Sequence, residues 1–415
     1  MAKAAGRMEK VWGWDNRIVP LGIYISVPFC RTKCSYCNFA SDVFSRSVFG
    51  RYVDRVCADI ADARPVAAEM GGQIEREVDS IYLGGGTPTV LEPAQLQRVF
   101  DALRAQFSVR TEAEITVECA PGTLAPDVLD GLLRCGVNRV SLGVQSFVDG
   151  EAAAVGRLHK RATVLEEIAR LRAAGITNIN VDLIAGLPHQ TAESWQASLA
   201  ETIATGVPHV SVYMLEVDED SRLGRELIAG GTRYHAHFVP DEGATADFYL
   251  AACAKLEASG VMRYEISNFA RAGCESRHNL KYWMRQPYLG FGVDAHSMLL
   301  STGREAEAIR FATSDSLEGY VAGLQLQRTV LLPAAALEEN FFLGLRLNRG
   351  VDLQTIGARF GREVVENMRS AIAESVADGL LQQHGDAIRL TPRGRLLSNE
   401  VFQRFLAPAG FSTLL

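Results

Sequence analysis

Three cysteines stand close together near the start of the chain and could supply ligands to a metal centre. Cys30, Cys34 and Cys37 lie in the stretch YISVPFCRTKCSYCNFASDVF with the spacing CxxxCxxC. A structural zinc site needs four protein ligands, commonly two CxxC pairs, and the other cysteines of the chain are isolated. The spacing is more typical of a cubane iron–sulfur cluster in which one iron lacks a protein ligand. Zinc bound by three thiolates and a distal histidine, and cysteines that only pack in a loop, are the alternatives.

A glycine-rich turn, GGGTPT at residues 84–89, is the second candidate binding element. Glycines tolerate positive φ and let the backbone approach a ligand closely, and the amides of such a turn can donate to a carboxylate. A turn of this kind is weak evidence alone. Its position after an apolar run and beside the cysteines favours a role in binding a zwitterionic ligand.

Short apolar or β-branched runs must position these residues. They lie at Leu21–Val27, Ser80–Leu83, Glu114–Val117, Arg139–Leu142, Asn178–Ile184 and His209–Met214, and segments with helical spacing separate most of them, at Ala94–Phe107, Ala125–Cys135, Arg161–Ala174 and Ala192–Thr205. The alternation predicts an α/β fold with a partial or full (β/α)6 TIM-like barrel, whose binding residues gather at the carboxyl ends of the strands. The cysteine run, the glycine turn, Glu118, Gly143–Gln145 and Gly186–Pro188 each follow a predicted strand. We therefore expect all five on the same rim.

Composition narrows the class of protein. The chain has 415 residues, 47% of them hydrophobic, and a formal net charge of −7. This length accommodates a barrel and a smaller domain, and the acidic balance without basic runs argues against nucleic acid as a partner. The N-terminus has no apolar signal region, and no run of 18 apolar residues follows. The sequence therefore predicts a cytoplasmic enzyme-sized protein.

The C-terminal third differs in pattern. Helical spacing begins near Leu337 and continues at Val351–Phe360 and Glu363–Ala377, and the stretch DGLLQQHGDAIRLTPRG alternates like a hairpin before a final helix. Helices with a hairpin predict an α+β winged-helix-like domain. The third helix is acidic, so the domain is expected to cover the barrel or dock a protein rather than bind DNA.

Tyr24, the cysteine spacing with Tyr36 before the third cysteine, and the GGGTPT turn together resemble the radical S-adenosylmethionine (SAM) superfamily, more narrowly its HemN/HemW branch of coproporphyrinogen III dehydrogenases and heme chaperones. The resemblance covers nearly the whole chain, to the LTPRGRLLSNEVF stretch. It implies a 4Fe–4S cluster on Cys30, Cys34 and Cys37, with SAM chelated by the open iron. It also implies SAM contacts from Tyr24, Tyr36, Gly85, Gly86, Thr87, Glu118, Gln145, Arg157 and Asp182. A structural ion pair between Arg157 and Asp182 is the alternative for those two residues.

Two features of the sequence distinguish between the dehydrogenases and the heme chaperones of this branch. HemN-type dehydrogenases carry a fourth cysteine two positions after the third, where this chain has Phe39, and they have a longer N-terminal segment. Both departures are similar to the HemW pattern. The run RHNLKYW resembles the HNxxYW motif associated with heme handling, which implies that His278, Asn279, Tyr282 and Trp283 bind heme. A packed aromatic corner is the alternative, His296 and Cys274 are second-choice iron ligands, and Asp294 stands where a small residue is expected.

The predicted domains are an N-terminal segment (1–20), a radical SAM barrel (21–235), a connecting region with the heme motif (236–330) and the winged-helix-like domain (331–415). The resemblance favours a heme chaperone that binds heme and delivers it to client hemoproteins, with peripheral association to the inner membrane through a partner. Oxidative decarboxylation of coproporphyrinogen III by a radical SAM dehydrogenase is the alternative, so the sequence alone does not decide whether the chain is an enzyme. A binding protein with a vestigial cluster is the third hypothesis, and the intact cysteine set argues against it.

Overall fold

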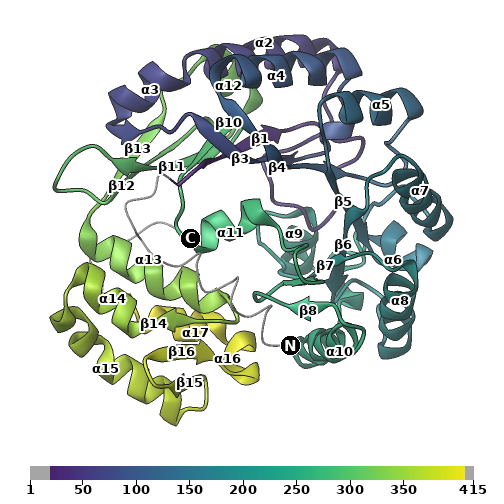
Figure 1. Ribbon diagram of the computed structural model, residues 1–415. Helices are drawn as coiled ribbons and strands as arrows, with labels where there is room; N and C mark the ends of the chain where they lie inside the picture. Colours follow the sequence, from purple (N-terminus) through teal and green to yellow (C-terminus); the bar gives the residue numbers. More distant parts are fainter. Residues whose placement is uncertain (1–18, 407–415) are drawn as a thin grey trace.

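The computed structural model describes residues 19–406. They form an open, curved sheet with helices on its outer face and a smaller domain beside its open side (Figure 1). The predicted N-terminal segment lies almost entirely outside these residues, as do the last residues of the C-terminal domain. All six predicted strands are confirmed, and they pair in parallel in chain order. They are β1 (Leu21–Val27), β3 (Glu77–Gly85), β4 (Ser108–Cys119), β5 (Arg139–Gln145), β6 (Asn178–Ala185) and β7 (His209–Met214).

Residues after β7 extend the sheet at both of its edges. Beside β7 lie β9 (Asn268–Ala270) and β8 (Met262–Arg263), both antiparallel. Beside β1 lies the parallel strand β10 (Tyr288–Gly292), followed by the antiparallel strands β11 (His296–Ser301), β12 (Ala308–Ala312) and β13 (Gln327–Leu331), and the short β2 (Gly72–Gln73) pairs with β11. The path runs from β13 to β8 without closing, so the predicted partial barrel is confirmed.

Helices cover the outer face of the sheet, as in a β/α barrel (Figure 1). Helix α4 illustrates why they form, because Leu96, Phe100 and Leu103 give it one buried face and the pair Glu92 and Gln95 caps its start. The helices of this layer are α2 (Phe49–Ala61), α3 (Ala63–Met70), α4 (Pro93–Gln106), α5 (Pro126–Arg134), α6 (Asp149–Ala154), α7 (Arg161–Ala173), α8 (Ala192–Thr205), α10 (Glu242–Ala258) and α12 (Leu317–Ala322). Helix α9 (Arg222–Ala229) packs against the loop that follows β1, where the Leu223 amide donates to the Ser35 carbonyl at 2.8 Å. Helix α11 (Arg277–Trp283) instead lies inside the curve of the sheet (Figure 1).

The predicted winged-helix-like domain is also confirmed. It has its own apolar core and a three-stranded sheet in the order β14, β16, β15. Its elements are α13 (Pro333–Arg346), β14 (Val351–Asp352), α14 (Leu353–Phe360), α15 (Arg362–Ala377), β15 (Leu381–His384), β16 (Ala387–Leu390), α16 (Pro392–Leu396) and α17 (Ser398–Gln403).

The C-terminal domain is joined to the open side of the sheet by specific contacts. The amide of Asn348 donates to the carbonyl oxygen of Tyr264 at 3.0 Å, and Glu265 forms a β-bridge with Leu347. The carboxylate of Glu339 on α13 pairs with the buried guanidinium of Arg285 at 2.7 Å. The domain is therefore fixed against the open side of the sheet.

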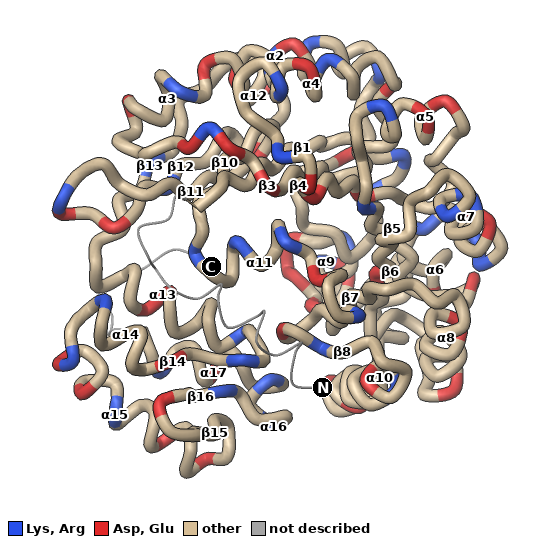
Figure 2. The backbone as a smooth tube through the Cα atoms, viewed as in Figure 1, with Lys and Arg blue, Asp and Glu red and all other residues tan. Residues whose placement is uncertain are grey.

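Charged residues of both signs are interspersed along the outer helices (Figure 2). In the described part of the chain, no helix combines the length and the apolar character needed to cross a bilayer.

Candidate functional site

The three predicted cluster cysteines lie in a loop that is firmly held at its base. The loop follows β1, and a bridge between Phe29 and Asp42 brings its two ends together, with the Cys30 amide donating to the Asp42 carbonyl at 3.0 Å. The Lys33 ammonium donates to the carbonyl of Phe39 at 2.7 Å from inside the loop. The cysteines are thus presented by a loop with a fixed backbone.

The glycine turn packs directly against that loop. The amide of Gly86 donates to the Val27 carbonyl, and the amide of Thr87 donates to the Phe29 carbonyl, each at 2.8 Å. A Cβ atom at position 86 would lie 2.7 Å from the Val27 oxygen, so only glycine allows this approach. We expected these amides to donate to a ligand carboxylate, but the Gly86 and Thr87 amides are already used in joining the turn to the cysteine loop.

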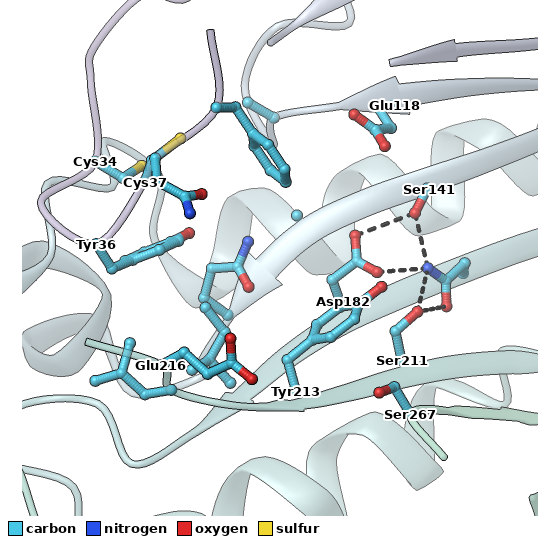
Figure 3. A pocket seen from close by; sticks show the side chains of 18 of the residues that line it. Cys34, Tyr36, Cys37, Glu118, Ser141, Asp182, Ser211, Tyr213, Glu216 and Ser267 are labelled. Carbon is cyan, nitrogen blue, oxygen red and sulfur yellow. Dashed lines mark hydrogen bonds between the residues drawn. The ribbon is translucent and has the colours of Figure 1, made fainter. Parts of the chain in front are cut away.

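A cavity of about 870 Å³ opens at the carboxyl ends of the strands, within the size range of small-molecule sites. Most of the predicted cluster and SAM residues line it, namely Cys30, Cys34, Tyr36, Cys37, Gly85, Gly86, Thr87, Glu118, Gln145, Arg157 and Asp182. Figure 3 shows Cys34 and Cys37 on one side of this cavity and Glu118 and Asp182 on strands opposite them. Tyr24 is the exception, because it lies in the wall of the sheet beside Tyr82 and His278.

Two carboxyl groups dominate the electrostatics of the cavity. Burial, and secondarily the charge of Asp182, raise the pKa of Glu118 to about 7, although the Tyr82 hydroxyl donates to its Oε1 at 2.9 Å. Burial also raises the pKa of Asp182, against hydrogen bonds that include those donated by Ser141 at 3.1 Å and Asn180 at 2.7 Å (Figure 3). A bound cation would relieve the repulsion between these two groups.

The residues present fit a polar, positively charged ligand such as SAM. Gln145 sits at a bulge in β5 with φ of 69°, a strained conformation that sets its side chain in the cavity wall. Its Oε1 is enclosed and has no hydrogen-bond partner within the described residues. This unpartnered acceptor and the two carboxyl groups match the amino and hydroxyl donors of the predicted ligand.

The guanidinium of Arg157 links the cysteine loop to the rim of the sheet. Its Nη1 donates to the Cys34 sulfur at 3.5 Å, and its Nη2 donates to the Gly143 carbonyl. Across residues 19–406, no ion pair joins Arg157 to Asp182, which was the alternative role for these residues. Arg157 is therefore placed to stabilise negative charge on the Cys34 sulfur.

The donor set also fits a cluster. Cys30, Cys34 and Cys37 line the same end of the cavity, and the Thr87 hydroxyl lies 3.8 Å from the Cys30 sulfur as a donor. Among the described residues, no three His, Cys, Asp or Glu side chains converge on a single point as the ligands of one metal ion do. A cubane requires no such convergence, because each thiolate binds a different iron.

The structure separates the residues of the predicted heme motif. His278 is fully buried, with its Nδ1 3.1 Å from the Ser80 hydroxyl and its Nε2 2.8 Å from the Tyr282 hydroxyl. Burial lowers the pKa of His278 to about 3. Asn279 lines the cavity, whereas His278, Tyr282 and Trp283 do not. Both nitrogens of His278 are thus engaged inside the protein.

The second-choice heme ligands lie elsewhere. His296 is exposed and its Nε2 is 3.6 Å from the carboxylate of Asp294, which adopts a positive φ of 53°. Cys274 is partly buried, and neither His296 nor Cys274 lines the cavity.

Several cavity residues were not predicted from the sequence. They come from the inward faces of β5, β6 and β7 and from the C-terminal domain, and they include Arg139, Ser141, Asn180, Ser211, Tyr213, Arg346 and Arg395. The polar residues alternating in the run NINVDLIA are a signal that could have indicated the inward face of β6.

Comparison with protein families places these elements in a known context. Residues 24–201 match the model of the radical SAM superfamily, and residues 331–397 match that of the HemN C-terminal domain.

Similarity to individual proteins extends over nearly the whole chain. Heme chaperone HemW of Bacillus subtilis is 33% identical, with 92% of this chain and 98% of that protein covered. Heme chaperone HemW of Escherichia coli is 30% identical, with 94% and 99% covered. Among solved structures, coproporphyrinogen III oxidase (HemN) from Escherichia coli, described as a radical SAM enzyme, matches with a TM-score of 0.78 and 26% identity, covering 93% of this chain and 90% of that one.

Proposed function

Because this chain belongs to the HemN/HemW branch of the radical SAM superfamily, we propose that it is a heme chaperone, which binds heme together with a 4Fe–4S cluster and SAM and delivers heme to hemoproteins such as respiratory enzymes. The full-length similarity to proteins named heme chaperone HemW supports this choice. We further propose that it acts in the cytoplasm, where its clients would include complexes at the inner membrane.

The proposal rests mainly on the exposure and position of Phe39. Its side chain is 66% exposed and lines the cavity at the position where the dehydrogenases have a fourth cysteine. An exposed aromatic ring offers an apolar face to a flat macrocycle and cannot ligate metal or exchange a proton. The chain therefore keeps the cluster cysteines but presents an apolar surface next to them.

The roles of the other residues follow from their places. Cys30, Cys34 and Cys37 would hold three irons of the cluster, and a cluster with SAM bound supplies one-electron reduction of the sulfonium. Glu118 and Asp182 would bind the amino and ribose groups, with Gln145 Oε1 as a further acceptor. Arg157 would balance the negative charge of the thiolates, and the glycine turn would keep the cysteine loop at a fixed distance from these groups.

A Soret titration tests heme binding. The anaerobically reconstituted protein should bind one equivalent of hemin, and Phe39→Ser should weaken binding, because it removes an apolar contact. Val43→Ser, an exposed apolar residue nearby that does not line the cavity, is the matched control. Failure of the wild type to bind hemin would reject the proposal.

The dehydrogenase is a second candidate, because the fold is similar to HemN over most of both chains. It predicts that the reconstituted protein, given SAM, a strong reductant and coproporphyrinogen III, releases decarboxylated product over many turnovers. The chaperone proposal predicts no such product while SAM is still cleaved. Chromatography of the porphyrins distinguishes the two.

A further inference from the structure

The C-terminal domain forms part of the wall of the cavity. Residues 395–400, at the junction of α16 and α17, line the cavity, as does Arg346 at the end of α13. This wall therefore holds two arginines, and Glu400 is its only acid within the described residues. The contacts of these two arginines indicate the kind of ligand that they could bind.

Arg346 is held in place by an aromatic ring. Its guanidinium carbon lies 4.3 Å from the centre of the Trp283 ring, a cation–π contact that fixes the plane of the guanidinium. Its Nε is enclosed and has no hydrogen-bond partner among the described residues. The nearby carboxyl of Glu265 is engaged by other donors, because its oxygens accept hydrogen bonds from the Ser267 amide at 3.2 Å and from the Asn268 side chain.

Arg395 likewise has an enclosed hydrogen-bond donor that an anion could bind. Its Nη1 donates to the carbonyl of Leu390 at 3.2 Å, but its enclosed Nε has no partner in the described structure. Burial and then the positive charge of Arg263 lower the pKa of Arg395. Arg263 has its own carboxylate, Glu257, at 3.6 Å. A negative ligand would therefore be more favourable beside Arg395 than water is.

We propose that Arg346 and Arg395 anchor the propionate carboxylates of a tetrapyrrole in the cavity, and that Trp283 is the positioning residue that aims Arg346. This inference rests on the proposed function and adds the orientation of the ligand, with its propionates toward the C-terminal domain and its apolar edge toward Phe39. Guanidinium groups suit this role because they bind carboxylates through two parallel hydrogen bonds. The assignment also gives Trp283 a role that does not require it to touch the macrocycle.

The test compares hemin with hemin dimethyl ester, which has the same ring but no carboxylates. In fluorescence-quenching titrations, Arg346→Gln and Arg395→Gln should each weaken hemin binding about tenfold and leave ester binding unchanged. Arg369→Gln, on the exposed surface of the same domain and paired with Glu366, is the matched control and should change neither. Circular dichroism and thermal melts check that each variant folds.

The role of Trp283 is tested by the preference for hemin over its dimethyl ester, because a purely structural role would not change that preference. Trp283→Phe keeps a ring under Arg346 and should preserve the preference for hemin over the ester, whereas Trp283→Leu should reduce that preference about as much as Arg346→Gln. Equal affinity of the wild type for both ligands, or an unchanged preference in the folded arginine variants, would overturn the anchor while leaving heme binding intact. Absence of hemin binding by the wild type would instead reject the proposed function and the anchor together.

Discussion

The carboxyl group of Glu118 should make the stability of the apo-protein depend on pH in a predictable direction. Its pKa is raised from 4.5 to about 7, first by burial and then by Asp182. The native state therefore binds the proton more tightly than the unfolded chain does, so this group causes no penalty below pH 4.5. Stability is lost as the pH rises from there to 7, where the native carboxyl must also ionise.

The size of the effect follows from the difference between the ordinary pKa of Glu118, 4.5, and its native pKa of about 7. At about 1.4 kcal/mol per pH unit, this difference destabilises the native state by at most about 3 kcal/mol above pH 7. Water in the open cavity will reduce that penalty. Glu118→Gln removes the ionisation while keeping an oxygen for the Tyr82 hydroxyl. The variant should therefore gain about 2 kcal/mol in free energy of unfolding, relative to wild type, between pH 5 and pH 8.

Urea unfolding of the apo-proteins at several pH values measures this difference. The pKa of Glu265 is also raised, and its contribution to the slope is the same in both proteins and cancels in the comparison. Repulsion between Glu118 and Asp182 is part of the measured difference, because it is lost when Glu118 is replaced. Glu166→Gln, a change of an exposed acid in the middle of α7, controls for the loss of one negative charge. A difference between Glu118→Gln and wild type that does not change with pH would refute the argument that this carboxyl is protonated in the native protein.

The remaining predictions concern the loop, the turn and the heme motif. Cys34→Ser should abolish the charge-transfer absorbance of the reconstituted cluster without changing the far-ultraviolet spectrum, whereas Cys57→Ser, outside the cavity, should retain it. Gly86→Ala should destabilise the protein by about 1–3 kcal/mol in urea unfolding, because its Cβ would meet backbone oxygens, while Gly150→Ala meets nothing and should not. His278→Ala should leave hemin affinity within about twofold, because both ring nitrogens are bonded internally; loss of the Soret shift would instead identify His278 as the iron ligand.

The sequence allowed the barrel strands to be predicted because each one is a short apolar run. The strand β10 was missed, since YLGFG is brief, rich in glycine and preceded by a helix that lies inside the sheet. Its pairing with β1 depends on contacts between residues more than 250 positions apart, such as Ile23 with Leu289. Local pattern gives no information about such pairing.

In the candidate site, too, the local features could be predicted from the sequence and the long-range ones could not. The cysteine loop, the glycine turn and Glu118 could be predicted because each directly follows a strand, and the strand ends meet at one rim. The heme motif was interpreted as one unit, but successive residues of a helix point about 100° apart, so α11 turns His278 inward and Asn279 toward the cavity. The arginine wall could not be predicted, because it exists only when the C-terminal domain docks through contacts such as Asn348 with Tyr264.

Transfer of heme to an acceptor tests the central claim most directly. The reconstituted protein, loaded with one equivalent of hemin, is mixed anaerobically with excess apomyoglobin, and the rise of the acceptor's Soret band is followed in time, with hemin–albumin as the passive donor. A chaperone should hand over its heme faster than albumin does, and the rate should increase with acceptor concentration because transfer occurs in a complex. A rate no faster than from albumin and independent of acceptor concentration would show simple dissociation and contradict the assignment.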